Sequence, residues 1–181
     1  MLEKNVKILH ATPDDALGIL NVLHKTWLDT YPNDEIGITE DDIEDSYKDS
    51  FTEGNVTRLK DKIANIPVNQ KRIVAKNDNL VVGVSTFVEN EENNQLKTMY
   101  VLPDFQGKGI GQMLWNEMSK FFNPNKDIIV QVATYNVGAI NFYKKKGFVD
   151  TGKRFTDEHF KMKSGAMIPE MEMVIKTKNL P

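Results

Sequence analysis

A glycine-rich turn between an expected strand and an expected amphipathic helix constrains the fold more than any other segment. It contains Gln106, Gly107, Lys108, Gly109, Ile110 and Gly111. Glycine lets several backbone N–H groups point at one spot, and the first N–H groups of a helix lack partners within the helix. Such a turn therefore binds a phosphate group, or it only allows a strand and a helix to pack closely.

Two common phosphate-binding motifs do not fit this turn. A Walker loop needs Ser or Thr directly after its Gly-Lys pair, but Gly109 follows Lys108 here. A dinucleotide fingerprint needs a further glycine five residues after the first, and Gln112 and Leu114 stand there for the two starting glycines. The turn must belong to another kind of site.

Around the turn, hydrophobic periodicity and turn residues predict an irregular order of strands and helices. Strands are expected at 6–10, 72–76, 80–88, 95–101, 128–133, 148–155 and 171–175, with a polar loop at 89–94, and helices at 12–30, from 39, and at 56–66, 110–122 and 136–147. The strand at 128–133 is apolar apart from Gln131, so we expect it to be buried on both faces. No linker or repeat interrupts the chain, which predicts one α/β domain over residues 1–181.

Composition excludes several classes of function. The 181 residues include 23 Lys and Arg against 26 Asp and Glu, and a net charge of -3 has the wrong sign for following a nucleic-acid backbone. No cysteine is present, so thiolate catalysis and cysteine-ligated metals are excluded. The three histidines lack metal-ligand spacing, so no metal site is expected.

The sequence contains no apolar run near the ~20 residues needed to span a bilayer, and its start does not resemble a secretion signal. We therefore expect a cytoplasmic protein that does not interact with a membrane. Acidic residues gather between Asp29 and Glu53. They either attract a cationic substrate or simply solvate the helices of that region.

A second motif further along the chain makes the pattern of the glycine-rich turn specific for one family. Following a strand that ends in Tyr-Val-x-Pro, residues 106–111 match the pattern Q/R-x-x-G-x-G/A, and about 25 residues later the chain matches N-x-x-A-x-x-x-Y-x-x-x-G-F at Asn136, Ala139, Tyr143, Gly147 and Phe148. Together they resemble the GNAT superfamily of acetyl-CoA-dependent N-acetyltransferases. The resemblance extends over the order of elements in nearly the whole chain. It implies a single-domain GNAT-like α/β fold, with a mixed, mostly antiparallel central sheet of about six to seven strands and helices on both faces.

The resemblance also implies acetyl-CoA as co-substrate, without a metal. The pyrophosphate of coenzyme A would lie on the amides of residues 107–112, and its pantetheine arm beside residues 99–101 and Asn136, which would also cap its own helix. The expected coenzyme-binding residues are Met99, Tyr100, Val101, Gln106, Gly107, Lys108, Gly109, Ile110, Gly111, Gln112, Asn136, Ala139 and Tyr143.

Tyr143 is the expected general acid. A phenol with an ordinary pKa of ~10 can donate a proton to the departing thiolate of coenzyme A, whose pKa should resemble that of a free thiol at ~8.5. Without the resemblance, Tyr143 is better explained as a helix residue that packs beside Phe142.

The general base is not defined by the sequence. Better-known members of the family often carry Glu where this chain has Gln95 and Gln131, and an amide cannot accept the proton. The remaining candidates are Asp29, bulk water and the three glutamates of the expected loop, Glu89, Glu91 and Glu92.

The acceptor pocket is expected between the first two helices, where Trp27 and Tyr31 would line it, although Trp27 also fits a core or lid position. His159, in the connection before the last strand, could flank the same pocket. The resemblance implies transfer to a primary amine, small or polyamine-like. Because no cysteine can carry an acetyl group, the transfer would be direct, within a ternary complex.

Three alternatives stay open at this level. The chain could acetylate a protein or peptide amine, or it could be a non-catalytic acetyl-CoA binding module, as the missing carboxylates at 95 and 131 suggest. It could also be a structural protein with an incidental glycine turn. A homodimer is compatible with each of these readings.

Overall fold

The central sheet has seven strands, and the computed structural model describes residues 5–177 around it. The strands are β1 Val6–His10, β2 Gln70–Asn77, β3 Leu80–Glu89, β4 Asn93–Val101, β5 Asp127–Ala133, β6 Val149–Phe155 and β7 Glu170–Ile175. Their order is β1-β2-β3-β4-β5-β7-β6, and every neighbouring pair is antiparallel except β4 and β5. The mixed, mostly antiparallel sheet is the one expected from the sequence.

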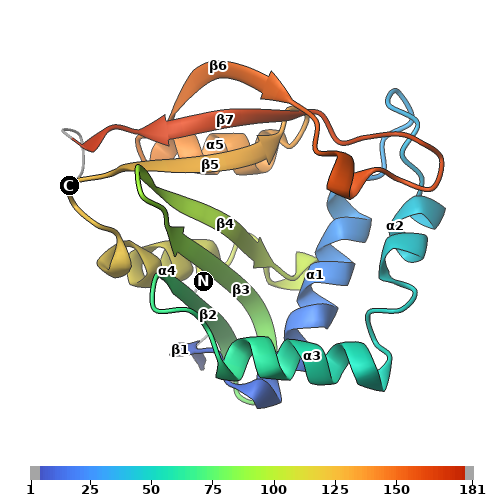
Figure 1. The fold of residues 1–181 in the computed structure, drawn as a ribbon, viewed down its shortest axis with the longest axis horizontal. Coiled ribbons are helices and arrows are strands. Elements are labelled where there is room, and N and C mark those ends of the chain that lie inside the picture. The colour runs from blue at the N-terminus through green and yellow to red at the C-terminus, as the bar shows by residue number, and fades with distance from the viewer. Residues whose placement is uncertain (1–4, 178–181) are drawn as a thin grey trace.

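Helices cover both faces of this sheet, with α4 and α5 behind it in Figure 1 and α1, α2 and α3 grouped in front and to the right. Their bounds are α1 Ala16–Thr30, α2 Glu40–Tyr47, α3 Glu53–Ala64, α4 Ile110–Met118 and α5 Val137–Lys145, with short 3-10 turns η1 Pro13–Asp15, η2 Pro103–Phe105, η3 Ser119–Phe121 and η4 Glu158–Phe160. Helices α4 and α5 lie side by side, since a Cβ at Gly111 would stand 3.5 Å from the Phe142 ring.

Several predicted boundaries were wrong by a few residues. The helix expected at 12–30 begins with η1, because Thr12 and Asp15 form a capping box around Pro13. The helix expected at 110–122 ends at Met118 and continues only as η3. The loop expected at 89–94 is a three-residue turn, closed by the Asn90 N–H, which donates to the Asn93 carbonyl at 2.8 Å.

Strands β4 and β5 pair over only four residues each and then separate. Asn93, Asn94, Gln95 and Leu96 pair with the stretch from Asp127 to Val130, and neither strand has a partner on that side beyond this point. On the other side of β4, Thr98 pairs with Thr86 and Leu96 with Phe87, so Lys97 is the extra residue of a β-bulge. A bulge bends its strand, and this one lies where β4 turns away from β5.

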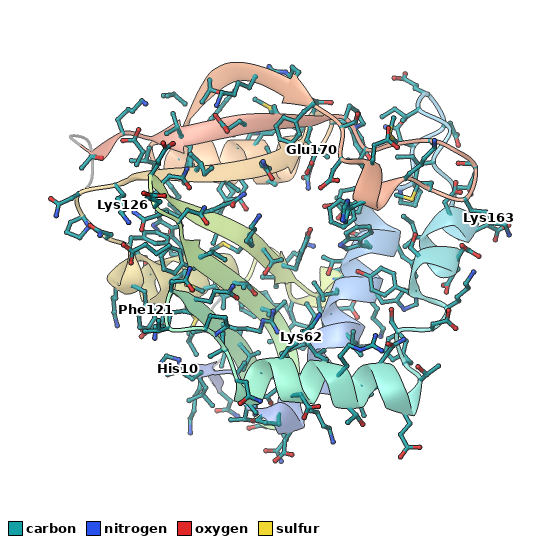
Figure 2. All side chains as sticks on the ribbon, in the orientation of Figure 1. His10, Lys62, Phe121, Lys126, Lys163 and Glu170 are labelled. Carbon is teal, nitrogen blue, oxygen red and sulfur yellow. The ribbon has the colours of Figure 1, made fainter. Side chains whose placement is uncertain are left out.

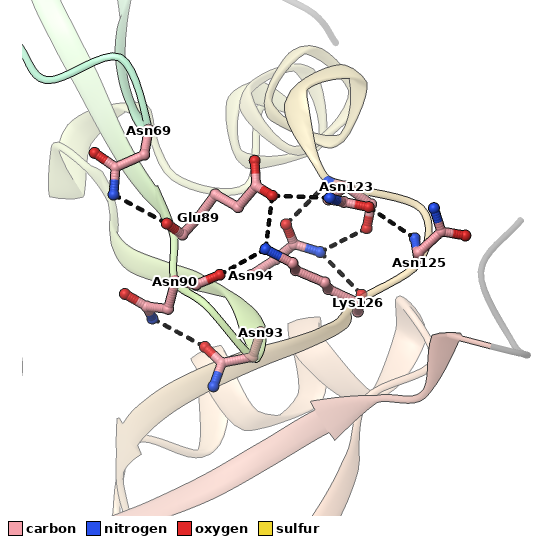
Figure 3. A network of polar contacts seen from close by, with 8 residues as sticks. All are labelled: Asn69, Glu89, Asn90, Asn93, Asn94, Asn123, Asn125 and Lys126. Atoms are coloured by element: carbon pink, nitrogen blue, oxygen red, sulfur yellow. Dashed lines mark hydrogen bonds and ion pairs between the residues drawn. The ribbon is translucent and has the colours of Figure 1, made fainter.

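A network of asparagines joins the paired ends of the two strands (Figure 3). Asn94 is fully buried, and its amide donates to the carbonyls of Asn123 at 2.8 Å and Lys126 at 2.9 Å. Its oxygen accepts from the Asn123 N–H at 2.9 Å. The Lys126 ammonium donates to Glu89 and to the Asn90 carbonyl, both at 2.8 Å. We call this set of residues the asparagine clamp, because it ties the start of β4 to the chain entering β5.

The expectation that β5 is buried on both faces was wrong in part. Gln131 is exposed and Ile129 is half-buried, whereas Ile128, Val130 and Val132 belong to the main hydrophobic core. One face of β5 packs into the core. The edge of β5 that pairs with β4 is open beyond Val130, where β4 has moved away and the cleft begins.

Replacing Asn94 by Ala should lower the free energy of unfolding by about 2–4 kcal/mol, because three partly buried backbone groups lose their hydrogen-bond partners. Urea denaturation followed by circular dichroism measures the loss. Asn125→Ala is the matched control, since this exposed side chain makes none of the bonds of the clamp, and it should change stability by less than about 0.5 kcal/mol. Equal losses in the two variants would contradict the clamp.

Candidate active site

A cleft of about 770 Å³ opens where β4 and β5 separate. Its lining includes nearly all of the residues that the sequence assigned to coenzyme binding, together with Tyr31 from the end of α1: Met99, Tyr100, Val101, Gln106, Gly107, Gly109, Ile110, Gly111, Gln112, Asn136, Ala139 and Tyr143. Lys108 and Trp27 are outside this lining. The fold thus brings both sequence motifs to one cavity.

The glycine-rich turn has the backbone that glycine permits. Gly107 and Gly109 have φ of +69° and +85°, in the left-handed region, and Gly109 caps the N-terminus of α4. The Gln106 side chain donates to the Val101 carbonyl at 3.1 Å and so fixes the turn against the end of β4. Lys108 lies with its ammonium 4.9 Å from the centroid of the Phe105 ring. Gly109, Ile110 and Gly111 line the cleft, so the positive end of α4 lies beside it.

The second motif forms the other side of the cleft. The Asn136 side chain accepts from the Ala139 N–H at 3.0 Å, which is the N-cap bond of α5. Two lysines at the end of this helix, Lys145 and Lys146, also line the cleft. The Lys146 ammonium donates to the side-chain oxygen of Gln112, which lies on α4. The sequence analysis did not assign these two lysines to the site. Their proximity to the glycine-rich turn depends on how α5 packs beside α4.

Tyr143 both packs in the core and lines the cleft. The residue is only 6% exposed, and its ring contacts Phe142 and Phe148 at centroid distances of 5.6 and 5.3 Å. Burial, and to a lesser extent the neighbouring Tyr100, raise the pKa of Tyr143 well above its usual range. Its hydroxyl therefore stays protonated at neutral pH and is able to donate a proton.

Of the candidate bases, only Asp29 lies in the cleft lining. Glu89 belongs to the asparagine clamp, where hydrogen bonds from Lys126 and Asn123 lower its pKa, and Glu91 and Glu92 lie in the turn before β4. These three glutamates precede the paired part of β4, whereas the cleft opens at its other end. Spacing in the sequence did not indicate at which end of the strand the cleft would form.

Gln95 and Gln131 meet at the closed end of the cleft. The Gln95 amide donates to the Gln131 oxygen at 3.5 Å, and neither side chain can act as a base. Nearby on β4, the Thr98 hydroxyl is the one buried side-chain polar atom within residues 5–177 that has no hydrogen-bond partner.

Three tyrosines join the helical side of the molecule to β4. The hydroxyls of Tyr31 and Tyr100 are 3.0 Å apart, and the Tyr135 hydroxyl donates to the Tyr31 carbonyl at 3.0 Å. Burial raises the pKa of all three, for Tyr135 to about 12. The sequence analysis did not single out Tyr135, although it directly precedes the Asn136 cap.

Trp27 lies beside these tyrosines rather than in the cleft. Its ring contacts Tyr31 at a centroid distance of 4.7 Å, Phe160 at 5.6 Å and Tyr47 at 5.7 Å. It packs against a second, smaller hydrophobic cluster, which we call the acceptor-side cluster: Tyr31, Ile38, Ile43, Ala133, Met162 and Ile168. This position agrees with the core or lid interpretation of Trp27. His159 projects outward with its side chain 94% exposed.

Asp42 holds the acceptor-side cluster together from α2. One carboxylate oxygen accepts from the N–H and hydroxyl of Thr39, both at 2.9 Å, and the other accepts from the Ser164 N–H at 2.8 Å. Burial alone raises the pKa of Asp42, but the bonds from Thr39 and Ser164 outweigh it and lower that pKa to about 2.

Within residues 5–177, no group of three or more His, Asp or Glu side chains could hold a metal ion. Over the same residues, no helix is long and apolar enough to cross a bilayer.

Comparison with known proteins identifies the family. The family model described as "Acetyltransferase (GNAT) domain" matches residues 69–150, which include the glycine-rich turn and the Tyr143 motif. A probable N-acetyltransferase of Mycobacterium tuberculosis is 26% identical over 94% of both chains. Residues 69–150, which include both motifs, therefore form a GNAT acetyltransferase domain. Acetyl-CoA is accordingly its co-substrate.

The solved structures agree on the fold of this GNAT protein. PaiA N-acetyltransferase of Thermoplasma acidophilum, solved in complex with coenzyme A, superposes with a TM-score of 0.72 at 18% identity, covering 94% of this chain and 98% of that one. The ribosomal-protein-S18-alanine N-acetyltransferase of Escherichia coli gives a TM-score of 0.64 at 12% identity, covering 95% and 94% of the two chains.

Asp42→Ala should lower the free energy of unfolding at pH 7 by about 2 kcal/mol, because the carboxylate no longer accepts hydrogen bonds from Thr39 and Ser164. The folded pKa lies below the unfolded value of ~3.9, so this stability is present above that value and is lost as pH falls through about 2. Urea denaturation between pH 7 and pH 2.5 should show the difference between variant and wild type shrinking. Asp41→Ala, at an exposed position on α2, should cost less than about 1 kcal/mol and serves as the control.

Proposed function

We propose that residues 1–181 form one N-acetyltransferase domain that moves the acetyl group directly from acetyl-CoA to the primary amine of a small, polyamine-like acceptor. The observation that carries the proposal is the cleft between β4 and β5, which has a glycine-rich helix start and a tyrosine hydroxyl on one side. Direct transfer within a ternary complex follows because the sequence contains no cysteine that could hold the acetyl group.

The chain's own groups fit coenzyme A along the whole cleft. Beyond Leu96 the edge of β4 has no strand partner, so residues 99–101 are able to pair with an extended arm. The amides of Gly109, Ile110 and Gly111 and the ammonium groups of Lys145 and Lys146 would hold its phosphates. Acetyl-CoA supplies the acetyl group as an activated thioester.

Tyr143 manages the proton of the leaving group in this proposal. Its hydroxyl is protonated at neutral pH, as that of a tyrosine with an ordinary pKa of ~10 would be, and it would donate that proton to the sulfur as the carbon–sulfur bond breaks. Gln95 and Gln131 cannot take the proton of the amine. The amine would lose it to water or to Asp29, the carboxylate in the cleft lining.

The acceptor would enter from the side of α1 and α2. That side carries the acidic residues from Asp29 to Glu53 and the rings of Trp27 and Tyr31. Negative charge and aromatic faces both favour a small cation over an anionic partner such as tRNA.

The first test is the release of coenzyme A thiol from acetyl-CoA with polyamines, amino acids, aminoglycosides and peptides as acceptors. At least one amine class should turn over, and Tyr143→Phe should lower kcat about 100-fold through loss of the proton donor. Coenzyme A at 100 times its Kd should raise the stability of wild type and variant alike by about 2.7 kcal/mol.

Tight coenzyme binding without turnover of any acceptor would favour a binding module instead. Absence of both binding and turnover would favour a structural protein. Full activity of Tyr143→Phe would contradict the acid role but leave the transferase intact.

The choice between small amines and peptides is tested by kcat/KM. Small diamines and triamines should exceed peptides that carry free N-terminal amines by at least about tenfold, because the acidic side of the cleft favours compact cations. Higher kcat/KM for peptides would identify a protein or peptide N-acetyltransferase.

A further inference from the structure

Glu170, the first residue of β7, is a half-buried carboxylate that lies outside the lining of the cleft. Its register partner is Ala133 at the end of β5. Partners in an antiparallel pair project from the same face of a sheet, and Ala133 packs in the acceptor-side cluster. Glu170 therefore faces α1 and α2, and Figure 2 labels it at the beginning of β7, near the end of α1.

The carboxylate of Glu170 has no ion-pair partner within residues 5–177. Its neighbour on the same face, Glu172, is different, because Lys153 forms an ion pair with it at 3.0 Å. Burial first, and then the charge of Asp157, raise the pKa of Glu170, while the charge of Lys97, a residue of the cleft lining, lowers it. Burying a carboxylate without an ion-pair partner raises the free energy of the folded protein. A bound cationic ligand would offset this unfavourable term.

The surroundings of Glu170 suit an organic cation. Its register partner Ala133 packs in one cluster with Tyr31, and the charge of Glu170 contributes to the raised pKa of Tyr31 and of Tyr100. Both tyrosines line the cleft, and the Trp27 ring packs against Tyr31. Aromatic rings beside a carboxylate stabilise a bound ammonium group from two directions.

Glu170 lies away from the closed end of the cleft. Val130 is the last residue of β5 that pairs with β4, and Ala133, the partner of Glu170, lies three residues further, or ~10 Å along the strand. The thioester, bound along residues 99–101, would point toward the closed end. A carboxylate at this distance is placed to bind a second charge of the acceptor rather than its reacting nitrogen.

We propose that Glu170 determines acceptor specificity by pairing with a second positive charge of the amine acceptor, against the rings of Tyr31 and Tyr100. This inference rests on the proposed N-acetyltransferase function and narrows it to acceptors that carry two or more positive charges. Glu170 binds the acceptor and takes no part in the bonds that form or break.

The experiment compares unbranched diamines of three to six carbons with the monoamines of equal carbon number. Wild type should favour the best diamine at least about tenfold in kcat/KM. Glu170→Gln should raise KM for that diamine about 10- to 100-fold, leave kcat within about twofold and abolish the preference. Glu172→Gln, on the same face of the same strand but paired with Lys153, should keep the preference.

Equal use of diamines and monoamines by wild type would leave the transferase standing and overturn the role of Glu170. A fall in kcat with unchanged KM in Glu170→Gln would also overturn it, since the carboxylate would then act on the reacting amine. If no amine is acetylated, the proposed function fails. In that case, calorimetry measures binding of the three- to six-carbon diamines to the coenzyme A complexes of wild type and Glu170→Gln. The substitution should weaken binding of the tightest diamine about tenfold, and unchanged affinity would overturn the role of Glu170.

Discussion

The separation of β4 from β5 is the constraint on which the site depends. Parallel neighbours normally continue side by side, but here pairing stops after Leu96 and Val130. Two features enforce this. The asparagine clamp fixes the strands together at one end, and the bulge at Lys97 bends β4 away beyond it. Because one end is fixed and the other bent, the cleft is built into the sheet and does not depend on a mobile loop.

The two faces of the sheet bring different groups of residues to the cleft. Helices α4 and α5 lie side by side on one face and bring together the glycine-rich turn, Tyr143 and the lysines that end α5. On the other face, the tyrosines and the acceptor-side cluster connect α1, α2 and the segment before β7. Asp42 joins two of these segments through Thr39 and Ser164. In the proposed function, the donor and the acceptor would approach the same point from opposite sides of the sheet.

The parts of the site predicted well from the sequence are those in which function depends on local backbone chemistry. The positive φ at Gly107 and Gly109 and the cap at Asn136 are properties of short segments, and they could be read from residue types and spacing. The general base could not be placed in this way. Glu89 was a candidate base in the sequence, but its carboxylate accepts a hydrogen bond from Lys126 in the clamp. This bond joins residues 37 positions apart.

By itself, the sequence determined the order of elements, the family and the two motifs, because glycine freedom, helix caps and hydrophobic periodicity act between near neighbours in the chain. Only the tertiary structure decided which end of β4 opens, that Lys145 and Lys146 line the same cleft as the glycine-rich turn, and that Glu170 is half-buried with no ion-pair partner among residues 5–177. The physical reason is that these features depend on strand register and on burial. Both arise from contacts between residues far apart in the sequence, and no local pattern encodes them.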